Sequence, residues 1–284
     1  MRESDQENIA GPVLFVVATP IGNLEDITLR ALRVLKEADL IAAEDTRTAR
    51  KLLNRYRIKK PLVSYYDPRE ETRSEEILSH LASGRRVALI SEAGTPGLSD
   101  PGWRLIRKAI DAGVRVVPVP GPSAILGALV VSGLPSHSFA FEGFLPPRAG
   151  PRKKKLVSLR EEERTMIFFE SPRRAAKTLA EIGELWGERK AALARELTKI
   201  HETVIRGTIP EVLKRLGDTP LKGEVVLVIE GCAGRRRSQK PLSAAEIDSL
   251  RRRLRLSRME AIKLAAELSG RAKREVYREY HRPQ

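Results

Sequence analysis

The stretch VALISEAGTPGLSDPG, residues 87–102, decides the fold class of this 284-residue chain. Its first four residues are apolar, as in a strand that is buried on both faces of a sheet. The twelve residues that follow contain three glycines and two prolines, which is the composition of a loop. Because ligands of parallel α/β sheets bind at the carboxyl ends of the strands, we expect a ligand site in residues 91–102.

Strand and helix patterns alternate on both sides of this stretch. Apolar runs cover Val13–Ala18, Asp39–Ala43, Leu62–Tyr65 and Val114–Val119, and helical spacing covers Thr28–Lys36, Thr46–Tyr56, Ser74–Ala82 and Trp103–Ala112. This alternation predicts a mostly parallel sheet with helices on its faces.

Strands dominate the middle of the chain. They are predicted at Phe139–Phe144, Met166–Glu170, Ala191–Glu196, Glu202–Arg206 and Glu224–Glu230, with helices only at Arg173–Trp186 and Pro210–Leu216. We therefore expect a second α/β domain with a larger antiparallel share. A cleft between two such domains is a preferred place for a ligand.

The C-terminal part is basic and helical. Residues 235–284 hold 15 Lys and Arg against 6 Asp and Glu. Helix starts are predicted by two capping boxes of the form S-x-x-E, Ser243 with Glu246 and Ser257 with Glu260, and Gly270 suits a helix end. The expected organisation is an N-terminal tail at residues 1–12, an α/β domain at 13–121, a second α/β domain at 122–232, a basic linker at 233–241 and a basic helix-turn-helix-like domain at 242–284.

The overall charge favours a polyanionic partner. The chain holds 52 Lys and Arg against 37 Asp and Glu, a net charge of +15, and such a surplus is typical of proteins that bind nucleic acid. The single cysteine, Cys232, excludes an internal disulfide, and the four scattered histidines form no zinc motif, so we expect no metal. The apolar segments are too short to span a bilayer, and the acidic start does not suit a secretory leader. We expect a soluble, cytoplasmic protein.

The glycine loop matches neither common nucleotide motif. Gly94-x-x-Gly97 departs from G-x-G-x-x-G, and the P-loop spacing from Gly97 to Gly102 is followed by Trp and Arg in place of Lys and Ser/Thr. The loop is thus predicted to bind a ligand by backbone contact, without a phosphate cradle, and the alternative is a turn-rich connection. Five further segments with polar residues or glycines flank predicted strands, at residues 18–24, 42–47, 118–124, 168–174 and 194–202. A structural interpretation competes at two of them: a hinge at 118–124, and helix capping by Asp45 with a solvated Arg47 at 42–47.

Eight motifs, in this order, resemble the tetrapyrrole methylase superfamily. They are TPIGNL (19–24), AAEDTR (42–47), SEAGTPGLSDPG (91–102), PVPGPSA (118–124), FEGFLP (141–146), FFESPRR (168–174), ARELTKIHE (194–202) and GEVVLVIEG (223–231). The resemblance covers Val13–Gly231 and, more loosely, the basic tail. It is closest to the branch that methylates the ribose 2′-hydroxyl of a cytidine in 16S rRNA. Three positions depart from the common pattern: Glu92 stands in place of Asp, Phe169 in place of Tyr and Arg173 in place of His.

The resemblance implies S-adenosylmethionine as methyl donor. It also implies a homodimeric enzyme that binds the donor between its two α/β domains, mostly by backbone groups. Carried onto this sequence, the expected donor contacts are Gly94, Thr95, Pro96, Gly97, Ser123, Ala124, Phe169 and Ala194. The expected contacts to RNA phosphate are Arg47, Arg173, Arg174 and Lys199, against the alternative of solvated surface cations.

Methyl transfer to a ribose hydroxyl needs a group that takes the hydroxyl proton. Asp45 and then Glu170 are the expected acceptors, and the alternatives are Glu196, Glu202, Lys199 and His201. Two other functions compete. A precorrin-type C-methylase on the same scaffold leaves the basic tail without a role, and a non-catalytic nucleic-acid-binding protein, with the tail as a helix-turn-helix, leaves the loops at the strand ends without one.

Overall fold

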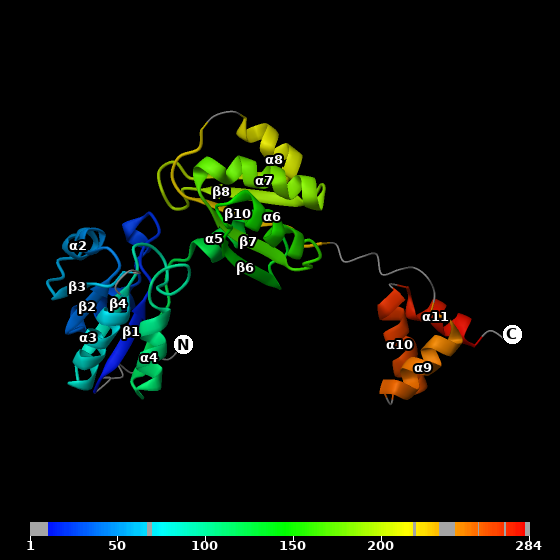
Figure 1. Ribbon diagram of the computed structural model, residues 1–284, viewed down its shortest axis with the longest axis horizontal. Helices are drawn as coiled ribbons and strands as arrows, with labels where there is room; N and C mark the ends of the chain where they lie inside the picture. Colours follow the sequence, from blue (N-terminus) through cyan, green and yellow to red (C-terminus); the bar gives the residue numbers. More distant parts are fainter. Residues whose placement is uncertain are drawn as a thin grey trace.

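The computed structural model describes residues 11–66, 70–217, 220–232, 242–254, 256–269 and 271–281. Two five-stranded sheets follow one another along the chain, and Figure 1 shows the helix α5 (Ala124–Ser132) at their junction. Three further helices form the C-terminal part. None of the helices in these ranges is both long and apolar enough to cross a bilayer.

The first sheet is entirely parallel, as predicted. Its strands are β1 (Val13–Val17), β2 (Leu40–Ala43), β3 (Leu62–Ser64), β4 (Arg86–Ile90) and β5 (Arg115–Val119), in the order β3-β2-β4-β1-β5. Four helices cover it: α1 (Leu29–Glu37), α2 (Thr46–Arg55), α3 (Glu70–Ala82) and α4 (Trp103–Asp111). Alternate residues of β1 point to opposite faces, so Phe15 packs with α1 and α2 while Leu14 packs with α3 and α4. The continuous apolar runs in the sequence follow from this burial on both faces.

The second sheet is mixed, which confirms the predicted antiparallel share. Its strands are β6 (Phe139–Phe144), β7 (Thr165–Glu170), β8 (Lys190–Arg195), β9 (Thr203–Thr208) and β10 (Val225–Ile229), in the order β6-β7-β10-β8-β9. Only the β6–β7 pair is parallel. One face is covered by α6 (Ala149–Ser158), α7 (Pro172–Trp186) and α8 (Ile209–Leu216), and the other face packs against α5.

The helix α6 was not predicted from the sequence. It contains Gly150 and Pro151 near its start and the run Lys153–Lys155, so it shows no broad apolar stripe. Its buried residues are Leu156 and the charged Arg152, whose guanidinium pairs with Glu181 at 2.7 Å. The buried face of α6 therefore includes an ion pair to another helix, and it lacks the apolar stripe by which a sequence pattern reveals a helix.

The C-terminal part forms three helices with their own core. They are α9 (Ala244–Leu254), α10 (Arg258–Ser269) and α11 (Lys273–Tyr280), and their shared core includes Ile247, Ile262, Ala265 and Val276. Both predicted capping boxes are present: the backbone N–H groups of Ser243 and Ser257 donate to the Glu246 and Glu260 carboxylates, each at 2.8 Å. The predicted helix end at Gly270, the linker at 233–241 and most of the N-terminal tail lie outside the described residues.

Candidate active site

Two loops lie together at the carboxyl ends of β1 and β4. Thr19, just after β1, and Gly94, in the loop after β4, exchange two backbone hydrogen bonds of 2.9 and 3.0 Å. The buried Thr19 hydroxyl donates a further hydrogen bond to the Ser91 carbonyl oxygen (3.3 Å). Gly94 has φ +80°, a conformation that favours glycine. These contacts hold the loop 91–102 against the loop 19–24.

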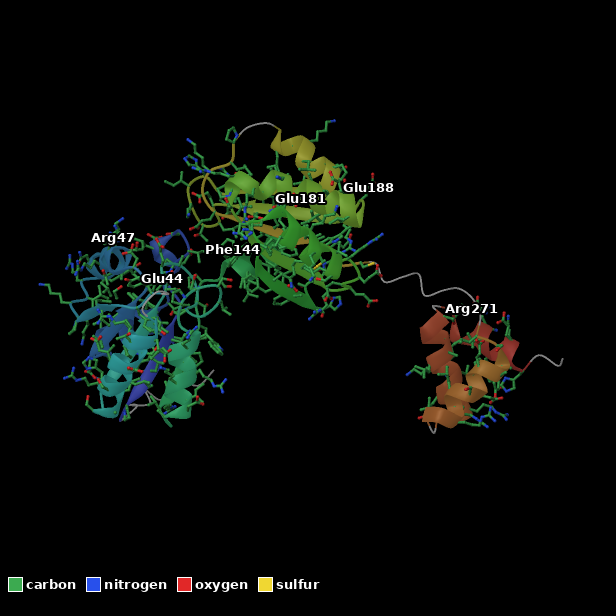
Figure 2. All side chains as sticks on the ribbon, viewed as in Figure 1. Glu44, Arg47, Phe144, Glu181, Glu188 and Arg271 are labelled. Carbon is green, nitrogen blue, oxygen red and sulfur yellow. The ribbon has the colours of Figure 1, made fainter. Side chains whose placement is uncertain are left out.

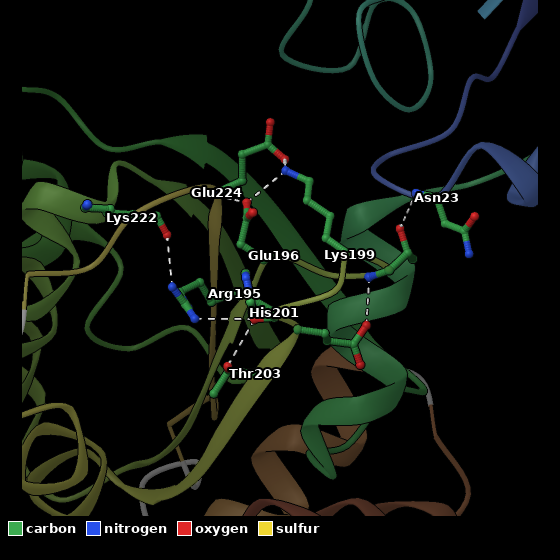
Figure 3. Close-up of polar contacts among 10 residues, drawn as sticks. Asn23, Arg195, Glu196, Lys199, His201, Thr203, Lys222 and Glu224 are labelled. Atoms are coloured by element: carbon green, nitrogen blue, oxygen red, sulfur yellow. Dashed lines mark hydrogen bonds and ion pairs between the residues drawn. The ribbon is translucent and has the colours of Figure 1, made fainter. Parts of the chain in front are cut away.

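The loop 19–24 also contacts the second half of the chain. The Asn23 backbone N–H donates to Thr198 Oγ1 (3.0 Å), in the connection between β8 and β9 (Figure 3). A Cβ atom on Gly22 would lie 2.9 Å from the Leu197 carbonyl oxygen, which is closer than real Cβ atoms approach. Only glycine fits there without a shift of the backbone, so this loop sets the approach of the two halves.

A cleft of about 290 Å³ lies between the two halves. Its walls are largely apolar, with Ile21, Leu98, Ala124, Ile125, Phe144, Phe169 and Val226 among the lining residues. Figure 2 shows Phe144 on the side of the second sheet that faces the first. The Phe144 ring packs against the ring of Phe169, with their centroids 5.5 Å apart. Among the described residues that line the cleft there is no Lys or Arg, and the ionisable ones are Asp100, Glu170 and Glu224.

The predicted donor contacts divide into three groups. Gly94, Thr95, Ser123, Ala124 and Phe169 line the cleft. Ala194 lines a side cavity of about 20 Å³ that shares four lining residues with the cleft. Pro96 and Gly97 line neither.

Gly97 has the positive φ that its place in the loop suggests, at +82°. Its Cβ would point toward Ile106 Cδ1 and the Trp103 backbone nitrogen, both at 3.6 Å. A side chain at Gly97 would therefore pack on the start of α4, outside the cleft, although the sequence predicts a donor contact there.

Glu170 is held by its own surroundings. Its side chain is fully buried, Oε1 accepts from the Ser171 backbone N–H (2.7 Å) and pairs with Arg174 (2.5 Å), and Oε2 accepts from the Thr178 hydroxyl (2.8 Å). Both carboxylate oxygens therefore bind groups in the first two turns of α7. This geometry favours an anchoring role for Glu170 over the predicted role of proton acceptor. The ion pair also occupies Arg174, which we expected to contact RNA phosphate.

Asp45 caps α2, which is the structural alternative that the sequence offers for the motif at 42–47. Its Oδ1 accepts from the Arg47 backbone N–H at 2.7 Å, and Oδ2 pairs with the Arg47 guanidinium at 3.0 Å. The side-chain and backbone hydrogen bonds from Arg47 lower the pKa of Asp45, which makes it a weaker proton acceptor. Asp45 does not line the cleft. The Arg47 side chain is 85% exposed, so it can still reach a phosphate while paired.

Lys199 lies between two carboxylates, one of which, Glu224, lines the cleft. Its Nζ is 2.8 Å from Glu196 Oε1 and 3.0 Å from Glu224 Oε2, and Figure 3 shows both contacts. Its charge is therefore already balanced, which favours a role in positioning Glu224 over the predicted contact to RNA phosphate. Arg173, in contrast, is exposed at the start of α7.

Asp100 lines the cleft, and sequence analysis did not single it out. Burial raises the pKa of Asp100 to about 7, the charges of Glu44, Glu92 and Glu224 add to the rise, and the Ser91 hydroxyl opposes it. These neighbours come from the ends of β2 and β4 and the start of β10. No group of three or more His, Cys, Asp and Glu suited to a metal ion occurs in the described part of the chain.

Known proteins resemble this chain in sequence over most of its length. A sequence profile of the tetrapyrrole (corrin/porphyrin) methylases matches residues 13–213. A protein named ribosomal RNA small subunit methyltransferase I from Halalkalibacterium halodurans is 41% identical over 99% of this chain and 98% of its own length. The protein of that name from Mesorhizobium japonicum is 47% identical over 94% and 90%.

The chain belongs to the tetrapyrrole methylase family, in its ribosomal RNA small subunit methyltransferase I group. A shorter member of the group, from Thermotoga maritima, is 48% identical, and 98% of its length matches only 77% of this chain.

Solved structures share the fold. Uroporphyrin-III C-methyltransferase from Thermus thermophilus, in complex with S-adenosyl homocysteine, aligns with a TM-score of 0.55 at 21% identity, over 78% of this chain and 97% of that one. A cobalt precorrin-4 methyltransferase aligns with a TM-score of 0.58 at 17% identity, over 77% and 94%. At these identities the likeness establishes the two-sheet architecture and nothing about the substrate.

Two functional candidates escaped sequence analysis although their motifs were recognised. Asp100 lies in the glycine loop 91–102, and Glu224 is the second residue of the motif at 223–231. The available signal was an acidic residue inside a loop already predicted to bind a ligand. The sequence predictions fell instead on carboxylates directly at strand ends, where capping of the next helix is the commoner use.

The anchoring role of Glu170 predicts a loss of stability on neutralisation. Glu170→Gln leaves the partly buried Arg174 without its partner, and we expect the free energy of unfolding to fall by about 3 kcal/mol. Glu37→Gln, which breaks the exposed Arg33–Glu37 pair, should cost less than about 0.5 kcal/mol. Urea denaturation measures both. A Glu170→Gln protein with wild-type stability and no methyl transfer would contradict the anchoring role.

The environment of Asp100 predicts that replacing its carboxylate with a neutral group stabilises the fold, by an amount that depends on pH. Its pKa of about 7 in the fold exceeds the ordinary value of 3.8, so the ionised carboxylate destabilises the fold above pH 7, and this cost disappears as the pH falls toward 4. Asp100→Asn should therefore raise Tm at pH 8, by a margin that shrinks between pH 7 and pH 4. Differential scanning calorimetry tests this, with Asp111→Asn at the exposed C-terminal end of α4 as control. A margin that stays constant with pH would contradict the prediction.

Proposed function

We propose that this chain transfers the methyl group of S-adenosylmethionine to the ribose 2′-oxygen of a cytidine in 16S rRNA, within the small ribosomal subunit. The single observation that carries the proposal is the lining of the cleft: apolar and aromatic walls, glycine backbone, and carboxylates as the ionisable groups. The high identity to a group named for ribosomal RNA methylation supports the choice of substrate.

The cleft fits a cationic nucleoside donor better than a phosphorylated one. Apolar walls and the Phe169 ring suit a nucleobase, and the carboxylates of Asp100 and Glu224 suit a positive charge. A phosphate group would meet these same carboxylates without a cation among the described lining residues. The donor supplies a methyl group on a positively charged sulfur, which is already a good electrophile. The residues of the chain therefore need only to bind it, align it with the hydroxyl and take up a proton.

The RNA surface proposed here lies outside the cleft. Arg47 and Arg173 are exposed at the starts of α2 and α7, and residues 235–284 carry 15 of the 52 cationic side chains. Cations placed around an acidic cleft separate the two recognition tasks: phosphate contacts hold the RNA, and the cleft holds the donor. The relatives named above are bacterial, and bacterial ribosomal RNA is modified in the cytoplasm, so we propose that location for the enzyme.

A tetrapyrrole substrate has less support. The solved tetrapyrrole methyltransferases are 17–24% identical, whereas the three relatives named above, at 41–48%, carry the ribosomal RNA name. Nor does a macrocycle account for the basic C-terminal part.

The substrate assignment has a direct test. The protein is incubated with methyl-labelled donor and, in separate arms, unmodified small ribosomal subunits, free 16S rRNA, a precorrin or duplex DNA. We expect label in the ribosomal arms, on a cytidine 2′-oxygen located by nuclease digestion and mass spectrometry. Label in the precorrin arm alone, or in none, would contradict the proposal.

The basic C-terminal helices should strengthen RNA binding more than they affect chemistry. None of the described residues of these helices lines the cleft, which supports a role outside the chemical step. Lys273, Arg274 and Arg278 are exposed on α11. Their triple substitution by Gln should raise the KM for the ribosomal substrate and reduce the slope of log K against log salt by up to about 2.

The matched control removes the same charge from α1, as the triple substitution by Gln of Arg30, Arg33 and Lys36, all exposed. We expect a smaller change in slope there. Filter binding at several salt concentrations gives both slopes. Equal slopes for the two triple variants would show that the tail has no special part in RNA binding.

We further propose that the enzyme is a homodimer that buries the outer face of α5. The sequence AILGALVVS is apolar on all sides, a pattern of buried helices, yet the side chains of Leu126 and Val130 are 52% and 71% exposed. Val130→Glu should convert the dimer to a monomer in sedimentation velocity. Val157→Glu, at an exposed apolar position of α6, should leave it dimeric. A wild-type monomer at micromolar concentration would contradict this.

A further inference from the structure

Two large apolar side chains are exposed in the cleft, one from each half of the chain. Leu98, in the loop 91–102, is 47% exposed, and Phe144, at the end of β6, is 58% exposed. Both line the cleft, whereas the other apolar side chains of its lining are buried or half-buried. Their exposure places Leu98 and Phe144 at the rim, where a ligand that enters from outside meets them first.

The ring of Phe144 reaches the cleft because β6 contains a bulge. Alternate residues of a strand point to opposite faces, so a regular strand would put Phe141 and Phe144 on opposite faces of the sheet. The register with β7 instead shifts between Phe141 and Gly143, which leaves Phe144 opposite Phe169. Both rings thus lie on the α5 face and contact the Phe169 ring, with centroid distances of 4.9 and 5.5 Å. Bulges beside functional sites often redirect a side chain in this way.

The backbone is held on both sides of Phe144. Before it, Gly143 has φ +63°, and a Cβ atom there would lie only 3.3 Å from Ser99 Oγ, in the loop 91–102. After it, the buried Arg152 guanidinium of α6 donates to the Pro147 carbonyl oxygen at 2.9 Å. An exposed ring on a fixed backbone loses little conformational freedom when a ligand packs on it.

The apolar lining offers surfaces for a flat ring at two depths. Phe169 packs against the Phe144 ring and is half-buried, and Ala194, in the side cavity, is buried. A donor nucleoside enclosed by the cleft meets this inner surface. A base that arrives as part of a large RNA meets the rim, where Phe144 is exposed. Since no Lys or Arg is among the described lining residues, the rim suits a base better than a phosphate.

We propose that the cytosine base of the RNA substrate stacks on the Phe144 ring and contacts Leu98 from the other half of the chain; this inference rests on the function proposed above. Unpaired RNA bases are commonly bound by stacking on aromatic side chains. A base held at the rim keeps the ribose that is bonded to it next to the cleft, where we place the donor.

The test compares Phe144→Ala, Phe144→Leu and Phe144→Tyr with the wild type in methyl transfer to unmodified small subunits. Calorimetry first gives the donor Kd of each full-length variant, so that every transfer is measured at saturating donor. Phe144→Ala should lower kcat/KM for the subunits by about tenfold or more, because the stacking surface is lost. Phe144→Tyr keeps the ring and should restore most of the activity, whereas Phe144→Leu, which keeps apolar bulk alone, should not. Leu98→Ala should also lower kcat/KM, by a smaller factor, and the donor Kd of the Phe144 variants should stay close to that of the wild type.

Phe139→Ala is the matched control. It removes a 36% exposed ring from the same strand, outside the lining of the cleft, and should leave kcat/KM close to the wild-type value. A weaker donor Kd for Phe144→Ala with a wild-type kcat/KM at saturating donor would overturn the inference, since the ring would then hold the donor. A fully active Phe144→Leu would also overturn it. If the wild type transfers no label to the subunits, the proposed function fails; if the wild type and Phe144→Ala transfer it equally well, only the role of Phe144 fails.

Discussion

The active-site cleft depends on one short loop, residues 19–24, that is fastened on both sides. Toward the first sheet, Thr19 exchanges two backbone hydrogen bonds with Gly94. Toward the second, Gly22 packs so tightly on the Leu197 carbonyl that a side chain does not fit, and Asn23 donates to Thr198. The two sheets have separate cores, and this loop bridges them. The width of the cleft follows from backbone contacts that few substitutions can adjust.

The second constraint is the separation of charge. The chain has a net charge of +15, yet the ionisable residues that line the cleft are carboxylates. Two cations beside the cleft are held by acidic partners: Lys199 by Glu196 and Glu224, and Arg174 by Glu170. An acidic, partly apolar interior and a basic exterior suit an enzyme that brings a cationic donor to a polyanionic substrate. This arrangement also explains why the glycine loop carries neither phosphate-binding motif.

Much of the fold could be predicted from the sequence, because strands buried on both faces leave continuous apolar runs, as in Val13–Val17 and Val87–Ile90. Helix α6 could not be predicted, because its buried face includes Arg152, whose partner Glu181 is distant in sequence. The loop 91–102, which its glycines single out in the sequence, lines the cleft through Gly94, Thr95, Leu98 and Asp100. Individual roles were harder, because a carboxylate at a strand end, such as Asp45 or Glu170, looks the same in sequence whether it caps a helix or takes a proton. The surroundings that distinguish Asp100 come from three strands far apart in the chain.

The central claim is that the donor binds against the loop 91–102, and two glycines of that loop test it as a matched pair. Gly94 and Gly97 have nearly the same backbone conformation, φ +80° and +82°, but only Gly94 lines the cleft. Valine at either position should cost about 1–3 kcal/mol in backbone strain. Donor Kd, measured by calorimetry alongside the melting temperature, should weaken at least tenfold, or about 1.4 kcal/mol, for Gly94→Val and change little for Gly97→Val. A folded Gly94→Val protein that binds the donor as tightly as the wild type would contradict the account.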